Sequence, residues 1–199
     1  MRVLIACERS GRVRDAFSTL GHDVYSCDLE PAEKPSSKHI IGDVFDVLNG
    51  QEWDLMIAHP PCTYLSVSGL HWNKRRHGRE QQTELALDFV RLLMAAPIRQ
   101  ICIENPIGCI STRIRKPDQI VQPWQFGDDA SKATCLWLKN LPLLRHTDVL
   151  LGGRKARRAN QTPSGQNKLG PSPERAYLRA ITYPGLACAM ANQWGVVAA

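Results

Sequence analysis

The residues Asp54-Leu55-Met56-Ile57-Ala58-His59-Pro60-Pro61-Cys62-Thr63-Tyr64 join a short apolar run to two prolines and a cysteine. The run from Leu55 to Ala58 predicts a buried strand. Pro60 and Pro61 lack amide donors and fix φ, so they end the strand and stiffen the turn after it. Open α/β sheets place their ligands at the carboxyl ends of parallel strands. We therefore expect Cys62 at a ligand-binding edge. The alternative is a small buried hydrophobe, as most free cysteines are.

A second stretch, Gln100-Ile101-Cys102-Ile103-Glu104-Asn105-Pro106, has the same construction of apolar strand, polar residues and proline. Glu104 is expected at the end of the neighbouring strand, facing the same crevice as Cys62. Two strand ends would then present a thiol and a carboxylate together.

Pro-Pro-Cys at 60–62, followed downstream by Glu-Asn-Pro at 104–106, resembles the cytosine-5 DNA methyltransferase family, whose signatures are Pro-Cys and Glu-Asn. The chain is more similar to the compact phage and prophage proteins described as cytosine methylase-like. The resemblance covers most of the chain, although only these two motifs are highly specific. It implies a Rossmann-like α/β fold, an open and mostly parallel sheet with helices on both faces. It also implies S-adenosylmethionine as cofactor, DNA as partner, Cys62 as nucleophile and Glu104 as the acid that binds the ring.

The amino-terminal part of the chain predicts a βαβ unit. A strand over 3–7, a turn, a helix over 12–20 and a strand over 24–27 follow one another, and the last ends at Asp28. The turn would aim backbone amides at a ligand. Asp28 would accept hydrogen bonds from ribose hydroxyls, unless it is a solvated loop acid. The resemblance places Asp43 at the adenine of the cofactor, and the alternative is a helix cap. The expected cofactor-binding residues are Glu8, Ser10, Gly11, Asp28, Asp43 and Pro60.

A formal net charge of +6 favours an anionic partner, with nucleic acid as the leading candidate, over a generically basic soluble protein. Directly after Cys62, the run 70–79 interleaves four cations with Trp72, which is typical of phosphate contact and base stacking, or else of a solvated face. Residues 151–175 predict a basic, mobile loop. The resemblance implies that this loop stands in the place of a target-recognition domain. The expected nucleic-acid-binding residues are Trp72, Lys74, Arg75, Arg76, Arg79, Lys132, Thr134, Arg154, Lys155, Arg157 and Arg158.

The remaining elements complete a single predicted domain over 1–199. The clearest helix covers 80–96, and we expect its apolar residues to be core positions without a chemical role. Residues 66–69 predict a flexible hinge, 131–138 a strand, and a last helix ends at Trp194. The apolar residues expected in the core from the 80–96 helix are Leu85, Leu87, Phe89, Val90, Leu92 and Leu93.

Seven cysteines, an odd number without a Cys-x-x-Cys motif, predict reduced thiols in the cytoplasm, that of a bacterial host if the chain is phage-encoded. His59 and Cys62 have a ligand-like spacing, but no second pair matches it, so no metal site is expected. Residues 2–7 are too short for a signal peptide, and no apolar stretch is long enough to span a membrane.

The implied chemistry needs both motifs. Carbon 5 of cytosine accepts a methyl group only after a thiolate has added to carbon 6, which is nucleophilic catalysis. The thiol must lose its proton, and we expect the cationic run 70–79 to lower its pKa. Glu104 would bind nitrogen 3 and the exocyclic amine, stabilising the charge that develops there. In a duplex, the base must first be flipped out.

Two alternatives remain open at this point. Without a recognition domain, the substrate could be a free pyrimidine nucleotide or a single strand. The turn at 8–11 has fewer glycines than that of the family, which motivates a non-catalytic nucleic-acid-binding protein with the same fold. Methylation of an exocyclic amine is less favoured, because His59 before the Pro-Pro turn and Cys62 after it fit neither end of the motif used by such enzymes.

Overall fold

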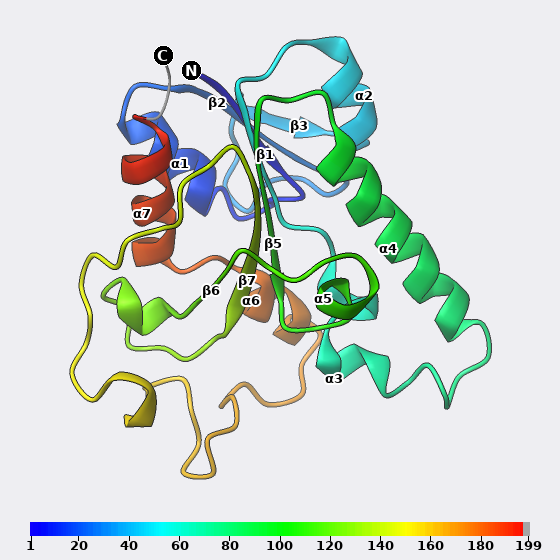
Figure 1. Ribbon diagram of the computed structural model, residues 1–199, viewed down its shortest axis with the longest axis vertical. Helices are drawn as coiled ribbons and strands as arrows, with labels where there is room; N and C mark the ends of the chain where they lie inside the picture. The colour runs from blue at the N-terminus through cyan, green and yellow to red at the C-terminus, as the bar shows by residue number, and fades with distance from the viewer. Residues whose placement is uncertain (197–199) are drawn as a thin grey trace.

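The computed structural model describes residues 1–196 and contains a seven-stranded sheet in the order β3-β2-β1-β4-β5-β7-β6 (Figure 1). The first five of these strands in the sheet order pair in parallel, whereas β7 is antiparallel to both β5 and β6. The strands are β1 (Arg2–Ala6), β2 (Asp23–Asp28), β3 (His39–Ile41), β4 (Leu55–Ala58), β5 (Gln100–Pro106), β6 (Gln119–Val121) and β7 (Thr134–Lys139).

Helices cover both faces of the sheet, so that two hydrophobic clusters form, one on each side. Side chains of α2 and α4 belong to one cluster, and side chains of α1 and α7 to the other. Figure 1 shows α2 and α4 on one side of the sheet and α1 and α7 on the other. This arrangement confirms the predicted Rossmann-like fold, an open and mostly parallel α/β sheet. The helices are α1 (Arg12–Thr19), α2 (Val44–Gly50), α3 (Val67–Leu70), α4 (Arg79–Ala95), α5 (Ile110–Arg113), α6 (Arg175–Ala180) and α7 (Pro184–Trp194).

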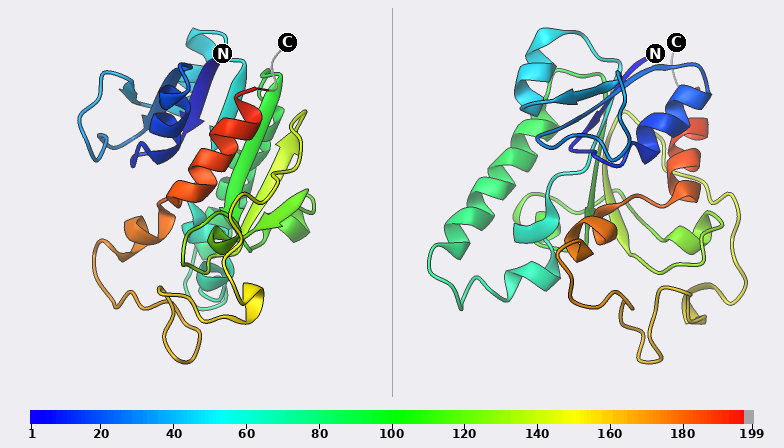
Figure 2. Two further views of the ribbon diagram at one scale, coloured as in Figure 1. Left: turned by 90° about the vertical axis from the view of Figure 1, so that its left-hand side faces the viewer. Right: turned by 180° about the vertical axis from the view of Figure 1, so that it is seen from behind.

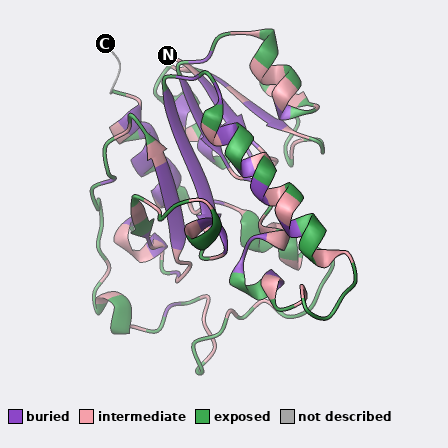
Figure 3. Ribbon diagram, turned by 45° about the vertical axis from the view of Figure 1, so that its right-hand side comes forward, coloured by how far each residue is buried: buried purple, intermediate pink, exposed green. Residues whose placement is uncertain are grey.

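The central strands β1, β4 and β5 are buried on both faces, as their continuous apolar sequences require (Figure 3). Strand β4 begins and ends where the sequence predicts, because the prolines after it cannot continue the ladder. Its last residue, Ala58, lies opposite Ala6 in β1 and Ile103 in β5. The residues that follow these three positions therefore meet at one edge of the sheet.

Two local predictions are wrong. The supposed hinge at 66–69 belongs largely to the short helix α3, and a Cβ on Gly69 would lie 2.1 Å from the carbonyl oxygen of Thr63. This segment is packed against the chain that follows Cys62. In α4, Leu85 and Leu92 are 63% and 57% exposed, because only the stripe of Leu87, Val90 and Leu93 faces the sheet. A short strand, β6, was not expected.

The segment between β7 and α6 extends beyond the end of the sheet (Figure 2, yellow to orange). Within it lie a 3-10 turn at Gly153–Lys155 and an isolated antiparallel bridge between Gln161 and Asn167. The expectation that this loop is unpacked fails at Arg158, which is only 5% exposed.

The predicted domain extends to residue 199, and residues 197–199 lie outside the described part of the chain. Of the helices in residues 1–196, none combines the length and the apolar character needed to cross a bilayer.

Candidate active site and neighbouring cavities

The structure brings Cys62 and Glu104 to the same edge of the sheet. Cys62 starts the 3-10 turn after β4 and is half-buried, whereas Glu104 lies in β5, one position beyond the last residue paired with β4, and is buried. The two groups interact electrostatically: burial raises the pKa of the Cys62 thiol, and the negative charge of Glu104 raises it further. The thiol and the carboxylate predicted from two separate motifs thus form one cluster.

The Asn105 side chain links the second motif to the Pro-Pro turn of the first. Its side-chain amide donates to the main-chain carbonyl of Pro60 over 2.6 Å, and Asn105 is buried. The bond fastens the Pro-Pro turn to β5. Since Cys62 directly follows this turn, the Asn105 bond helps to fix the position of the thiol relative to Glu104.

The carboxylate of Glu104 is held by several partners. His59 Nδ1 donates to Glu104 Oε2 over 3.0 Å, and the hydroxyl of Thr134 is a further hydrogen-bond partner. Burial alone would raise the pKa of Glu104, but these bonds and the charge of Lys132 leave the pKa below its ordinary value. From the sequence, His59 was considered as a metal ligand and as part of the Pro-Pro motif, but not as a partner of Glu104. The signal that could have found it is its place at the end of β4, beside the end of β5.

The expected source of thiol activation is wrong. The cations that lower the pKa of Cys62 are Lys132 and Arg179, not those of the run 70–79, and burial outweighs them so that the pKa is raised. Lys132 precedes β7 and Arg179 lies in α6, so both reach the site from distant parts of the sequence. A raised pKa favours the protonated thiol over the thiolate.

The run 70–79 is occupied with contacts of its own. The guanidinium of Arg76 lies over the ring of Trp72 at 4.3 Å from its centroid. Arg79 lies over the ring of Tyr64 at 4.1 Å and donates to the carbonyl of Thr63 over 2.8 Å, so it supports the turn that carries Cys62. Only Lys74, Arg75 and Arg76 are exposed cations of this run.

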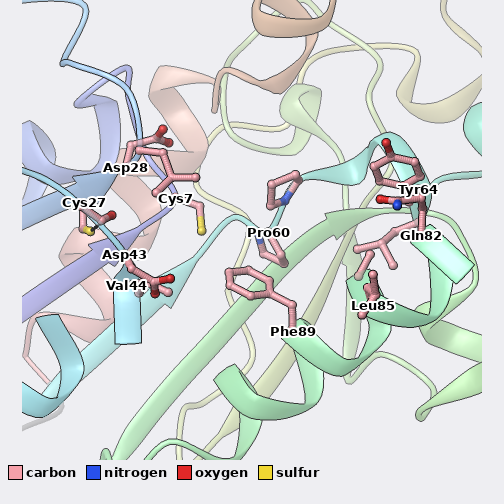
Figure 4. Close-up of a pocket in the computed structure, with 15 residues that line it drawn as sticks. Cys7, Cys27, Asp28, Asp43, Val44, Pro60, Tyr64, Gln82, Leu85 and Phe89 are labelled. Atoms are coloured by element: carbon pink, nitrogen blue, oxygen red, sulfur yellow. Dashed lines mark hydrogen bonds between the residues drawn. The ribbon is translucent and has the colours of Figure 1, made fainter. Parts of the chain in front are cut away.

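A cavity of about 360 Å³, which we call the strand-end cavity, lies on the other side of the Pro-Pro turn. Figure 4 shows Asp28, Asp43 and Cys7 at one end of it, Tyr64 at the other, and Pro60 between them. Three of the six predicted cofactor-binding residues line this cavity: Asp28, Asp43 and Pro60. Asp43 also caps α2 by accepting from the amide of Phe45 over 2.8 Å, so the alternative prediction for it is confirmed.

The other three predicted cofactor residues build the turn before α1 and do not line the cavity. Glu8 accepts hydrogen bonds from the amides of Val13 and Arg14 over 2.7 and 3.2 Å, and burial raises its pKa. The hydroxyl of Ser10 donates to Glu8 over 3.3 Å. Gly11 adopts φ of 72°, which favours glycine. Glu8 therefore caps the first turn of α1.

The strand-end cavity also contains side chains to which the sequence assigned no chemical role. Leu85 and Phe89 of α4 line it, together with Val44 of α2 and Leu29. Helical periodicity cannot distinguish such wall positions from core positions, because both are apolar and lie near the face of the helix that meets the sheet. The cavity is thus an apolar slot with carboxylates at one end.

A second cavity of about 380 Å³, the cationic cavity, lies in the segment after β7. The predicted residues Arg154, Lys155, Arg157 and Arg158 all line it, beside Trp124, and the described lining contains no acidic side chain. Arg154, Lys155 and Arg157 are exposed. The prediction of nucleic-acid contact is corrected for Arg158, whose buried guanidinium donates to three loop carbonyls, including that of Gly153 over 2.8 Å.

Thr134 and Lys132 also make contacts within the protein. Thr134 is buried against Glu104, which corrects its predicted contact with nucleic acid. Lys132 is half-buried and donates to the carbonyls of Ala180 and Ile181, each over 3.3 Å. Within residues 1–196, no cluster of three His, Cys, Asp or Glu side chains could hold a metal ion.

No family model and no curated protein matches the chain. A solved structure to which it is similar is described as a candidate DNA modification methyltransferase encoded within a prophage, from E. coli. The two are 17% identical, with a TM-score of 0.46, and the match covers 69% of this chain and 46% of that protein. The chain thus spans less than half the length of that protein.

Proposed function

We propose that the protein is an S-adenosylmethionine-dependent methyltransferase that modifies carbon 5 of cytosine in DNA through a covalent cysteine adduct. The observation that carries this proposal is the pairing of Cys62 with Glu104 at adjacent strand ends, directly beside the strand-end cavity. A binding protein requires neither a thiol nor a buried carboxylate at such a place.

The strand-end cavity fits the cofactor. Its volume lies in the range of small-molecule sites, and its apolar walls suit a planar base. Asp28 would accept hydrogen bonds from the ribose hydroxyls, while Asp43 and Phe89 would hold the adenine. Pro60 and Pro61, which also line the cavity, would separate the cofactor from the base. When bound, S-adenosylmethionine supplies an electrophilic methyl group.

The residues of the chain would divide the remaining work. The Cys62 thiolate would form a bond to carbon 6 of a flipped cytosine. Carbon 5 would then form its bond to the methyl group as the bond from that group to the sulfonium sulfur breaks, which leaves a neutral thioether. Glu104 would bind nitrogen 3 and the exocyclic amine, where charge develops as sulfur adds. Loss of the carbon 5 proton to a base and release of the sulfur would complete the cycle. Lys132 and Arg179, which lower the pKa of the otherwise raised thiol, would favour the thiolate.

Phosphate contact would fall to exposed cations on both sides of this edge. Lys74, Arg75 and Arg76 lie on the α4 side, and Arg154 and Arg157 lie in the segment after β7. Such contacts position a nucleic acid without reading its sequence.

A second candidate function keeps the chemistry but acts on a free pyrimidine nucleotide or a single strand. It is favoured by the segment 151–174, which holds only a 3-10 turn and an isolated bridge where a recognition domain would stand.

The test is covalent trapping on DNA that contains 5-fluorocytosine, with S-adenosylmethionine, read by intact mass. Fluorine cannot leave as a cation, so the enzyme should remain attached to the DNA. The adduct should disappear in Cys62→Ala and persist in Cys188→Ala, which removes an exposed thiol away from the site. Absence of an adduct on duplex DNA, with an adduct on a single strand or methyl transfer to dCMP, would favour the second candidate. Absence of all three would contradict methyl transfer and leave a nucleic-acid-binding protein.

A further inference from the structure

His59 lies between two buried carboxylates at three neighbouring strand ends. Glu8 follows β1, His59 follows β4 and Glu104 lies in β5, and these strands are adjacent in the sheet. The side chains of His59 and Glu104 are 11% and 7% exposed. Nδ1 of His59 bonds to Glu104 over 3.0 Å, whereas Nε2 is buried without a hydrogen-bond partner among residues 1–196. The charge of His59 also acts on Glu8.

This placement has a cost that packing alone does not explain. A buried imidazole nitrogen without a partner is unfavourable, and an apolar side chain of similar size would avoid the penalty. What the imidazole supplies is a donor to one oxygen of Glu104 in a site of low dielectric, where a fixed hydrogen bond is strong. Because Oε2 accepts from His59 and the Thr134 hydroxyl is a second partner, the carboxylate cannot rotate freely.

We propose that His59 is a positioning residue, which holds Oε2 of Glu104 so that Oε1 is presented to the pyrimidine ring. The inference rests on the proposed function, in which Glu104 binds nitrogen 3 and the exocyclic amine. It assigns His59 no contact with the substrate. Glu104 carries the recognition, and His59 limits the orientations from which it can do so.

The groups that face this pair determine the expected pH effect. Glu104 is faced by His59 from β4, by Thr134 and Lys132 from the β7 side, and by the Cys62 thiol. Glu8, with Arg14 near it, faces His59 from the β1 side. Burial raises the pKa of Glu104, and among the contacts that lower this pKa the hydrogen bond from His59 has the largest effect. Removal of His59 leaves the burial in place, so the pKa of Glu104 should rise.

The test compares His59→Leu with His59→Asn, whose amide can replace the Nδ1 donor, and with His77→Leu as an exposed control. Carboxyl carbons of glutamate are followed by NMR across pH, and Glu104→Gln identifies the Glu104 signal. In His59→Leu the Glu104 midpoint should move to higher pH, and adduct formation on 5-fluorocytosine DNA should slow by about tenfold to a hundredfold. His59→Asn should restore both, and cofactor affinity should not change in either variant.

The inference would be overturned by an unshifted Glu104 midpoint in His59→Leu, or by equal defects in the Leu and Asn variants. Parallel loss of cofactor affinity and thermal stability would reveal a merely structural role and overturn it as well. If His59→Leu fails to fold, the imidazole ¹⁵N chemical shifts of His59 are compared between the unchanged protein and Glu104→Gln. The inference requires these shifts to differ, and equal shifts would overturn it. The NMR measurements do not depend on catalysis. An absent adduct in the unchanged protein would therefore contradict the proposed function and leave the His59–Glu104 relationship to be judged by titration.

Discussion

Gly108 lies so close to Leu65 that a Cβ at position 108 would stand 1.9 Å from the Leu65 carbonyl oxygen. The amide of Cys109 donates to the same carbonyl over 2.8 Å, and Ser66 pairs with Gly108 in an isolated bridge. The turn after β5 therefore holds the segment that follows Cys62. The segments that follow the two motifs are thus joined by main-chain contacts, while the motifs themselves are joined by the bond from Asn105 to the Pro60 carbonyl.

Gly108→Ala should destabilise the protein by about 1–3 kcal/mol, because backbone must move to admit the methyl group. The matched control is Gly50→Ala at the end of α2, where the added Cβ meets open space and should be neutral or stabilising. Urea unfolding measures both. Equal stability of the two variants would show that the contact between Gly108 and Leu65 yields without cost.

Asn105→Ala should cost about 1–3 kcal/mol of stability and also slow adduct formation, since the buried Pro60 carbonyl loses its donor and the Pro-Pro turn its fastening. Asn192→Ala is the control, because Asn192 makes a similar bond, to the Cys188 carbonyl over 2.9 Å, on the surface of α7. Chemical denaturation and the trapping rate are compared for both. A slower trapping rate in Asn192→Ala to the same degree would remove the special role of the Asn105 bond.

The alkylation rate of Cys62 should keep rising with pH beyond the range of an ordinary thiol, because burial and the charge of Glu104 raise its pKa. Lys132→Met should move the midpoint higher, since a cation that lowers the pKa is lost, and Glu104→Gln should move it lower. Iodoacetamide labelling of the Cys62 peptide, in a Cys188→Ser background, follows the reaction. Lys34→Met, at an exposed site, serves as control. A midpoint unmoved by Lys132→Met would place this cation too far from the thiol to matter.

Asp28→Asn and Asp43→Asn should each weaken S-adenosylmethionine binding by about tenfold to a hundredfold, through loss of a charge-assisted hydrogen bond. Asparagine retains the cap of α2 at position 43, so folding should be preserved. Asp88→Asn on the outer face of α4 is the control. Calorimetric titration gives the affinities. Unchanged binding in both cavity variants would move the cofactor out of the strand-end cavity.

The double variant Arg154→Ala with Arg157→Ala should bind DNA less tightly and with a weaker salt dependence. The slope of log K against log salt should fall by about 0.9 for each lost phosphate contact. Fluorescence anisotropy on Cys62→Ala protein separates this binding from catalysis. Arg99→Ala with Arg145→Ala removes the same charge outside both cavities. An equal change of slope in the two double variants would show that DNA binding depends on the total positive charge and not on the cationic cavity.

The sequence was most informative where local chemistry decides structure. Prolines set the end of β4, and parallel strands brought Cys62 and Glu104 to one edge. The missed features depend on long-range packing. Lys132 and Arg179 reach the thiol only because β7 runs antiparallel and α6 returns to the site, which no local pattern encodes.

A different ambiguity concerns residues whose type fits two roles equally well. Phe89 has the spacing of a core residue but lines the strand-end cavity, together with Leu85 and Ala86 of the same helix. Glu8 has the position of a ligand residue but caps α1, because the amides of Val13 and Arg14 take both of its oxygens. Only the packed structure distinguishes these roles.

The bridge between Gln161 and Asn167 brings the two ends of a short surface turn together. A folded unit spliced in at Ser164 would begin and finish at neighbouring points, which is the geometry that tolerates insertions. It would stand beside the cationic cavity, to which Gln161, Pro163 and Gly165 contribute, and would leave the sheet undisturbed. Under the proposed function, target choice would be separable from chemistry: a module added here could bring new sequence preferences while Cys62 and Glu104 stay as they are.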